Sequence, residues 1–278
     1  MRAFIGAGLA VTTMIGAGAA AAAPNVEIHH AVARVTIIPE ARGDVVVSIV
    51  KANPRLPLKV TRVGDAVLID GGLGWRSANC HTFFGHAAAS VWGIGDIHYE
   101  DMPQIVVRTP RNVKVGADGA VFGTIGAGDS VDLANGGCGD WTVADQAGAL
   151  TARLAGSGDL HAGSAGAADF QVAGSSDVTM RAARGGMSTG ISGSGDVTVD
   201  AVNGPLKAHI SGSGDVRVHG GAVTTMEVAV AGSGDVHFGG VARSLTARVS
   251  GSGDVSAAKV TGAVSKHVSG SGDVSVGR

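Results

Sequence analysis

Eight aspartates recur at nearly constant spacing, and their pattern raises the question of a metal site. Successive members lie 19, 18, 19, 19, 20, 19 and 19 residues apart. Each ends a Gly-Ser-Gly-Asp motif, with Gly-Cys-Gly-Asp and Gly-Ser-Ser-Asp as variants at the first and third places. A row of carboxylates, one per repeat, could bind a row of cations. The members are Asp140, Asp159, Asp177, Asp196, Asp215, Asp235, Asp254 and Asp273.

Calcium takes six to eight oxygen ligands, but each repeat supplies one carboxylate. Cation binding by the aspartates of the six full motifs is therefore the less favoured interpretation, and no metal site is predicted. Aspartate after Gly-Ser-Gly is suited to accept backbone N–H bonds at a tight turn. The turn role is the main expectation. The cation candidates are Asp159, Asp196, Asp215, Asp235, Asp254 and Asp273.

The residues around each aspartate predict the elements that position it. Apolar residues follow each aspartate at the first and third places, with a polar residue between them, as in Val197-Thr198-Val199. A second alternating segment follows, as in Leu206, Ala208 and Ile210. Each unit of about 19 residues thus holds two short strands that cannot bury their apolar face alone. Stacked units can, so the sequence predicts an all-β right-handed parallel β-helix, a β-solenoid with ~19-residue coils.

The repeat also predicts which side chains align between coils. Lys207 and Glu227 follow the aligned residues Leu206 and Met226, so they should face each other. Lys266 takes the place of inward Ala247, and we expect it to reach solvent at an open end and to discourage end-to-end association.

Three regions are expected along the chain. Residues 1–22 form a signal peptide, with Arg2, an apolar stretch and small residues before the cleavage site. Residues 24–136 form an N-terminal β region, interrupted at 71–102 by a Gly-, His- and aromatic-rich loop insertion or cap. Residues 137–278 form the regular β-helix. Strands upstream are expected at 32–38, 44–50, 58–61, 66–69, 104–107 and 113–115.

At this point the sequence resembles the bacterial family called putative auto-transporter adhesin, head GIN domain. The resemblance rests on the Gly-Ser-Gly-Asp-Val repeats behind a signal peptide and on the segments beginning at Ile28 and Pro103, and it covers about 28–276. It implies an exported β-helical protein for which adhesion has been proposed.

The two cysteines are expected to matter for structure. Cys80 and Cys138 could form a disulfide in an oxidising compartment, which would tie the insertion to the first coil of the repeat. Zinc binding by Cys80 with His81, His86 and His98 is the alternative, but their spacing matches no closed zinc site.

Composition and charge narrow the function. A formal net charge of -2 without a run of Lys or Arg speaks against nucleic acid as a partner. Catalysis needs two groups in different environments, whereas the aspartate row is uniform. We therefore expect an exported, non-enzymatic protein of the periplasm or cell surface, without cofactor or transmembrane segment after signal cleavage, in a structural or adhesin-like role. Its partner would be a surface glycan or envelope component. The alternative is a glycan-binding or glycan-cleaving β-helix.

Overall fold

The computed structural model describes residues 25–74, 78–83 and 86–277, and the side chains of Asn25, Thr82, Phe83 and His86 lie outside the description. The predicted signal peptide also lies outside the described residues. The chain forms a parallel β-solenoid of about nine turns, which confirms the predicted fold class. No helix in the described ranges is long and apolar enough to cross a membrane.

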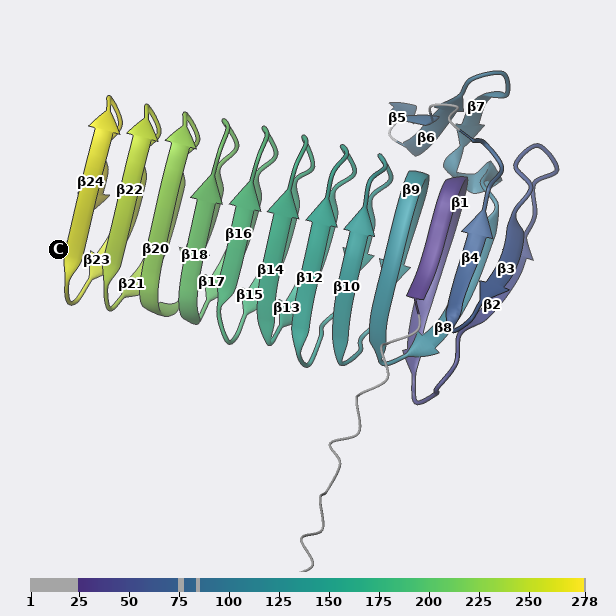
Figure 1. The fold of residues 1–278 in the computed structure, drawn as a ribbon, viewed down its shortest axis with the longest axis horizontal. Helices are drawn as coiled ribbons and strands as arrows, with labels where there is room; N and C mark the ends of the chain where they lie inside the picture. The colour runs from purple at the N-terminus through teal and green to yellow at the C-terminus, as the bar shows by residue number, and fades with distance from the viewer. Residues whose placement is uncertain (1–24, 75–77, 84–85, 278) are drawn as a thin grey trace, which may run out of the picture.

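Two parallel ladders form the regular part of the solenoid (Figure 1). Each coil contributes one strand to ladder A, turns at a corner formed by the Gly-x-Gly-Asp motif, and contributes one strand to ladder B. Ladder A comprises β10 (Ser130–Asn135), β12 (Ala149–Leu154), β14 (Ala167–Val172), β16 (Met187–Ile191), β18 (Gly204–Ile210), β20 (Ala222–Gly232), β22 (Leu245–Gly251) and β24 (Val264–Gly270). Ladder B comprises β11 (Trp141–Val143), β13 (Leu160–Ala165), β15 (Val178–Ala183), β17 (Val197–Val202), β19 (Val216–Gly220), β21 (Val236–Ala242), β23 (Val255–Val260) and β25 (Val274–Val276).

The ladders continue upstream through strands that lack the Gly-x-Gly-Asp corner. β1 (Asn25–Glu40) and β9 (Asn112–Ile125) each run through the corner as one long strand, so each serves both ladders. β4 (Ala66–Asp70) extends ladder A and β8 (Gln104–Pro110) extends ladder B. β3 (Lys59–Val63) and β2 (Val46–Lys51) then pair antiparallel with them at the end of the stack. The sequence predicted shorter strands here because Gly and Ala interrupt the apolar alternation.

Residues 71–102 were expected to form a loop insertion on the solenoid or part of its N-terminal cap, and in the described part this segment has regular secondary structure. The segment holds a three-stranded antiparallel sheet of β5 (Ala78–Phe83), β6 (His86–Val91) and β7 (Gly95–His98), followed by the 3-10 helix η1 (Tyr99–Asp101). The sheet exists because it buries its own small core, in which Ala89, Val91 and Ile97 pack with Phe122 of β9. Figure 1 shows it beside one end of the solenoid.

One continuous apolar core runs along the axis between the two ladders. The inward residues of successive coils stack in register, as in Leu206, Met226 and Leu245. Trp141 is fully buried, and its ring lies where a Cβ on Gly123 would be. Burial of such apolar rows contributes most to the free energy of folding, and a single coil could not bury its apolar face alone.

The register between coils agrees with the alignment predicted from the repeat. Lys207 faces Glu227, and Ala247 faces Lys266. Lys266 is exposed, and its ammonium donates to the carbonyl oxygen of Val274. Its effect on end-to-end association stays a prediction.

We expect the Lys207–Glu227 pair to contribute only about 0.2–1 kcal/mol, since it is an exposed cross-strand pair. Its Nζ and Oε2 atoms lie 3.3 Å apart, and more than half of each side chain is exposed. A double-mutant cycle with alanine at both positions, followed by denaturant unfolding, measures the coupling. A coupling of zero would contradict a formed pair.

Candidate functional site

The aspartate row is a structural device between coils. Oδ1 of each aspartate accepts the backbone N–H of the next aspartate in the row, at 2.7–3.0 Å over seven consecutive steps. The N–H after each aspartate in turn donates to the main-chain carbonyl of the next aspartate, as Val197 N does to Asp215 O at 2.8 Å. The side chain thereby supplies the acceptor that the backbone lacks where it turns from one ladder to the other.

The expected role as an acceptor of backbone N–H bonds is therefore right, but the expected position of the donor is wrong. The carboxylates do accept backbone N–H bonds, but from the adjacent coil rather than from their own turn. Within the described residues no group of three or more His, Cys, Asp or Glu is arranged to hold a metal ion.

We expect Asp196→Ala to lower the free energy of unfolding by about 1–2 kcal/mol, because the N–H of Asp215 loses a charged acceptor at 2.8 Å. Relief of repulsion between neighbouring carboxylates offsets part of this loss. Thermal unfolding of Asp196→Ala beside the exposed-site control Ser194→Ala measures the effect. A melting temperature of the unaltered protein that calcium raises strongly and EDTA lowers would instead identify the row as a cation site.

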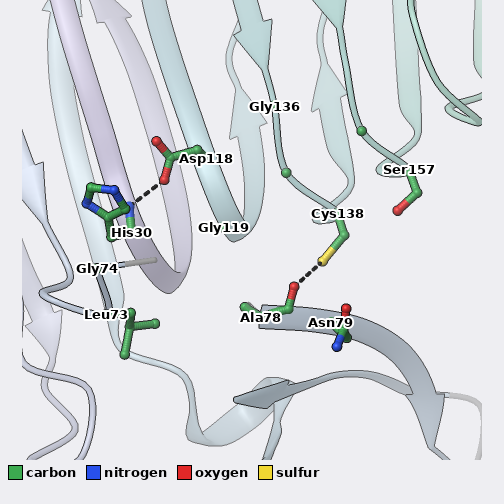
Figure 2. A pocket seen from close by; sticks show the side chains of 12 residues that line it. His30, Leu73, Gly74, Ala78, Asn79, Asp118, Gly119, Gly136, Cys138 and Ser157 are labelled. Carbon is green, nitrogen blue, oxygen red and sulfur yellow. Dashed lines mark hydrogen bonds between the residues drawn. The ribbon is translucent and has the colours of Figure 1, made fainter. Parts of the chain in front are cut away.

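A cleft lies where the insertion meets the first corners of the solenoid (Figure 2). It encloses about 380 Å³, and backbone of Gly119, Gly136 and Gly137 lines one side of it. Ala78 and Asn79 of β5 line the opposite side, as Figure 2 shows. This corner cleft is the irregular place in which an enzyme of this fold would be sought.

The disulfide between Cys80 and Cys138 fixes one side of the corner cleft. It joins the insertion to the Gly-Cys-Gly-Asp corner, and the two Cα atoms lie 5.6 Å apart. The sequence allowed this bridge beside the zinc alternative. Sγ of Cys138 also lies 3.6 Å from the carbonyl oxygen of Ala78, which is a contact only, since a disulfide sulfur carries no proton. The zinc alternative is excluded for Cys80, whose sulfur is bonded to carbon and sulfur.

Charged groups in the corner cleft support the backbone. His30 has a positive φ of 50°, and β1 bulges there between Ile28 and Ala31. Asp118 secures this bulge, because Oδ1 accepts the N–H of His30 and Oδ2 lies 2.7 Å from Nδ1 of His29. Both carboxylate oxygens are thus occupied by protein partners, which leaves Asp118 poorly placed to act as a base on a ligand.

A second hollow lies on the outer face of ladder B, over β11, β13, β15 and β17. It encloses about 630 Å³ and has a floor of small residues, among them Ala144, Ala162 and Gly163. We call it the B-face hollow. The small residues could be found in the sequence, but nothing in the repeat pattern singles them out, because Ala162 stands at an ordinary inward position, aligned with Val143 and Met180, and Ala144 and Gly163 follow the apolar positions of their strands.

The outward row that crosses the B-face hollow is polar on every coil. One residue per coil stands at the place after the first apolar residue of each ladder B strand, and consecutive members are direct register partners. Nδ1 of His161 lies 2.6 Å from Oγ1 of Thr179, and Nδ1 of His237 lies 2.8 Å from Oγ of Ser256. We call this the B-face row: Thr142, His161, Thr179, Thr198, Arg217, His237, Ser256 and Ser275.

One ion-paired cluster borders the B-face hollow. Arg181 forms a salt bridge with Asp145 and donates from Nε to Oγ of Ser164 at 3.0 Å. The N–H of Ser164 donates to Oδ1 of Asp145 at 2.7 Å. This backbone bond, followed by the bond from Arg181, lowers the pKa of Asp145 below the usual value of 3.8. Asp145 is therefore a stable anion at neutral pH.

The chain is thus an all-β solenoid that carries the B-face row, the B-face hollow and a corner cleft fixed by a disulfide. Residues 101–222 match the family model described as "Putative auto-transporter adhesin, head GIN domain". The resemblance expected from the repeats is confirmed over this stretch. No curated protein matches the chain.

Two solved structures are similar to this chain over most of its length. A crystal structure of a putative lipid binding protein from Parabacteroides distasonis has 15% identity and a TM-score of 0.51, and the alignment covers 92% of this chain and 93% of that one. A putative adhesin from Bacteroides fragilis has 14% identity and a TM-score of 0.43, with 91% and 92% covered. At this identity the first likeness supports the fold alone.

Proposed function

We propose that this chain is an exported, non-enzymatic binding protein of the bacterial envelope or cell surface, and that its B-face row holds an extended polar ligand such as a surface glycan. The single observation behind this proposal is the in-register outward row of hydroxyl and imidazole groups across the B-face hollow. One polar group per coil, repeated every ~4.8 Å, suits a ligand that itself repeats along its length.

Ladder A also carries outward polar residues in register, from Asp132 to Ser265. Several of their charges are paired with charges on the same ladder, which favours ladder B as the ligand face. Arg153 donates to Asp132 at 2.7 Å, and Lys207 pairs with Glu227. The hydroxyls of the B-face row are uncharged and can both donate and accept, as sugar hydroxyls require of their partners.

Two features support export. The apolar N-terminal stretch after Arg2 has the composition of a signal peptide. The disulfide between Cys80 and Cys138 suits an oxidising compartment such as the periplasm or cell surface. A match to a family described as an adhesin head is consistent with the same location.

A glycan-cleaving enzyme is the rival, and the electrostatics of the B-face hollow speak against it. Glycoside hydrolysis requires a general acid whose pKa is raised. The hollow's carboxylates are Asp145, whose pKa is lowered, and Asp200, which lies 3.3 Å from Nδ1 of His219. Asp200 is exposed at the surface and is not enclosed by apolar side chains.

Capture on an array of bacterial surface glycans, followed by mass measurement of the captured glycans, tests the proposal. We expect saturable retention of the chain beginning at Asn25 and no change in glycan mass after prolonged incubation. Retention by no glycan would contradict the proposed ligand class. Shortened glycans with new reducing ends would establish the enzyme instead.

A further inference from the structure

Exposed aliphatic side chains gather at the end of the solenoid formed by β2 and β3. Four of the nine large apolar side chains exposed in the described part of the chain lie here. Ile49 and Val50 of β2 are 42% and 57% exposed, and Val60 and Val63 of β3 are 40% and 64% exposed. Figure 1 places both strands at the outer edge of the stack, away from β24.

Part of this apolar surface is core left uncovered. Ile49 pairs with buried Ile105 and Val60 with buried Ile69, so both stand on core-facing positions of their strands. The guanidinium of Arg62 crosses from β3 to the carbonyl oxygen of Val45 and ties the two strands together at this end. No further strand among the described ones covers them, since β2 pairs only with β8 and β3 only with β4.

The same segment carries an excess of basic residues, and Asp65 and Asp70 of the β3–β4 hairpin lie beside it. Residues 46–63 contain four basic residues and no acidic residue, in a chain whose formal net charge is -2. Lys51, Arg55 and Lys59 are exposed beside the aliphatic side chains. We call Ile49, Val50, Val60 and Val63 with these three basic residues the end patch.

We propose that the end patch docks the protein onto an anionic lipid surface. Aliphatic side chains surrounded by Lys and Arg match the boundary between acyl chains and anionic headgroups. Protein interfaces are instead enriched in aromatic residues and depleted in Lys, and 46–63 has two Lys and no aromatic residue. A second copy of the same end would bring like charges together, and basic residues on edge strands discourage strand addition.

The docking is peripheral. The outer edges of β2 and β3 carry unpaired backbone groups, which are costly in hydrocarbon but are hydrated at headgroup level. Ile49, Val50 and Val60 then reach the acyl boundary along the exposed edge, and Val63 reaches it from the opposite face of β3, while the basic side chains stay among the headgroups. The inference goes beyond the proposed function, since the end patch and the B-face row lie on different parts of the solenoid.

Vesicle cosedimentation of the chain beginning at Asn25 tests this inference. We expect binding to vesicles containing phosphatidylglycerol, little binding to phosphatidylcholine vesicles, and a fall in binding as salt rises. Arg55→Ser with Lys59→Ser should weaken binding roughly 25-fold, at about fivefold for each basic residue near an anionic surface. These two side chains are chosen because Arg62 and Lys51 also bond to backbone carbonyls.

Matched control variants distinguish docking through the end patch from nonspecific effects of basic or exposed apolar side chains elsewhere on the solenoid. Val50→Ser with Val63→Ser should weaken binding at least about tenfold, while Val241→Ser with Val264→Ser, of 42% and 41% exposure, should not. Arg243→Ser with Lys259→Ser, both exposed, should likewise leave binding unchanged. Thermal unfolding checks that each variant is folded.

Three results would overturn the inference. They are failure of the unaltered chain to bind anionic vesicles, equal loss in the end-patch and control pairs, and self-association through the end patch without vesicle binding, which would assign the surface to protein contacts.

Discussion

Gly212→Ala should lower the free energy of unfolding by roughly 3 kcal/mol or more. A Cβ at this position would lie 2.2 Å from the carbonyl oxygen of Gly193 in the preceding coil. That oxygen already accepts the N–H of Ser213 at 3.0 Å and of Gly214 at 3.3 Å. The corner cannot move away from the added methyl group without breaking these bonds, and the rigid stack transmits the displacement to its neighbours.

Ser233→Ala is the control, since Ser233 is exposed in the next corner and should change stability by less than about 0.5 kcal/mol. Denaturant unfolding of both variants gives the comparison. Equal midpoints for the two would mean that the corners are not packed backbone to backbone, and the account of the repeated first glycine would fail.

Replacing both cysteines, Cys80→Ser with Cys138→Ser, should cost about 2–4 kcal/mol and release the insertion first. The bridge spans 58 residues, and loss of such a cross-link frees the unfolded chain. The core beneath the insertion is small, so it cannot compensate alone. Limited proteolysis and thermal unfolding should show early cleavage within 71–102 while the regular coils persist.

A reductant should reproduce this effect in the unaltered protein and add nothing in the double variant. Unchanged melting and unchanged proteolysis on reduction would contradict the stapling role of the disulfide. Ser252→Ala, exposed in a distant corner, controls for nonspecific effects of substitution.

Much of the regular solenoid follows from the sequence because its pattern repeats. Residues such as Lys207 and Glu227 occupy equivalent places in successive units, and equal unit length forces them into register. The upstream coils were harder to predict. The second half of β9, with Gly119 and Gly123, reads as turn-rich, yet it forms strand because its neighbours β1 and β11 pair with it.

The site was less predictable than the fold, since it depends on contacts between coils. The aspartate motif indicates a backbone acceptor, but only the stack shows that the N–H it bonds belongs to the following coil. The B-face hollow arises from small residues such as Ala162 and Gly163 beside Arg181, and periodicity does not report such gaps. The antiparallel sheet of the insertion was missed because alternation is weak in its Gly-rich sequence.

Ligand affinity of paired threonine variants tests the central claim most directly. The account predicts that Thr179→Val with Thr198→Val, which removes two hydroxyls of the B-face row without changing side-chain shape, weakens binding of an array-selected glycan about tenfold or more. The same substitutions on ladder A, Thr151→Val with Thr246→Val, should leave the Kd unchanged. Equal affinity of all three proteins, or loss only in the ladder A pair, would contradict the assignment of the B-face row as the ligand face.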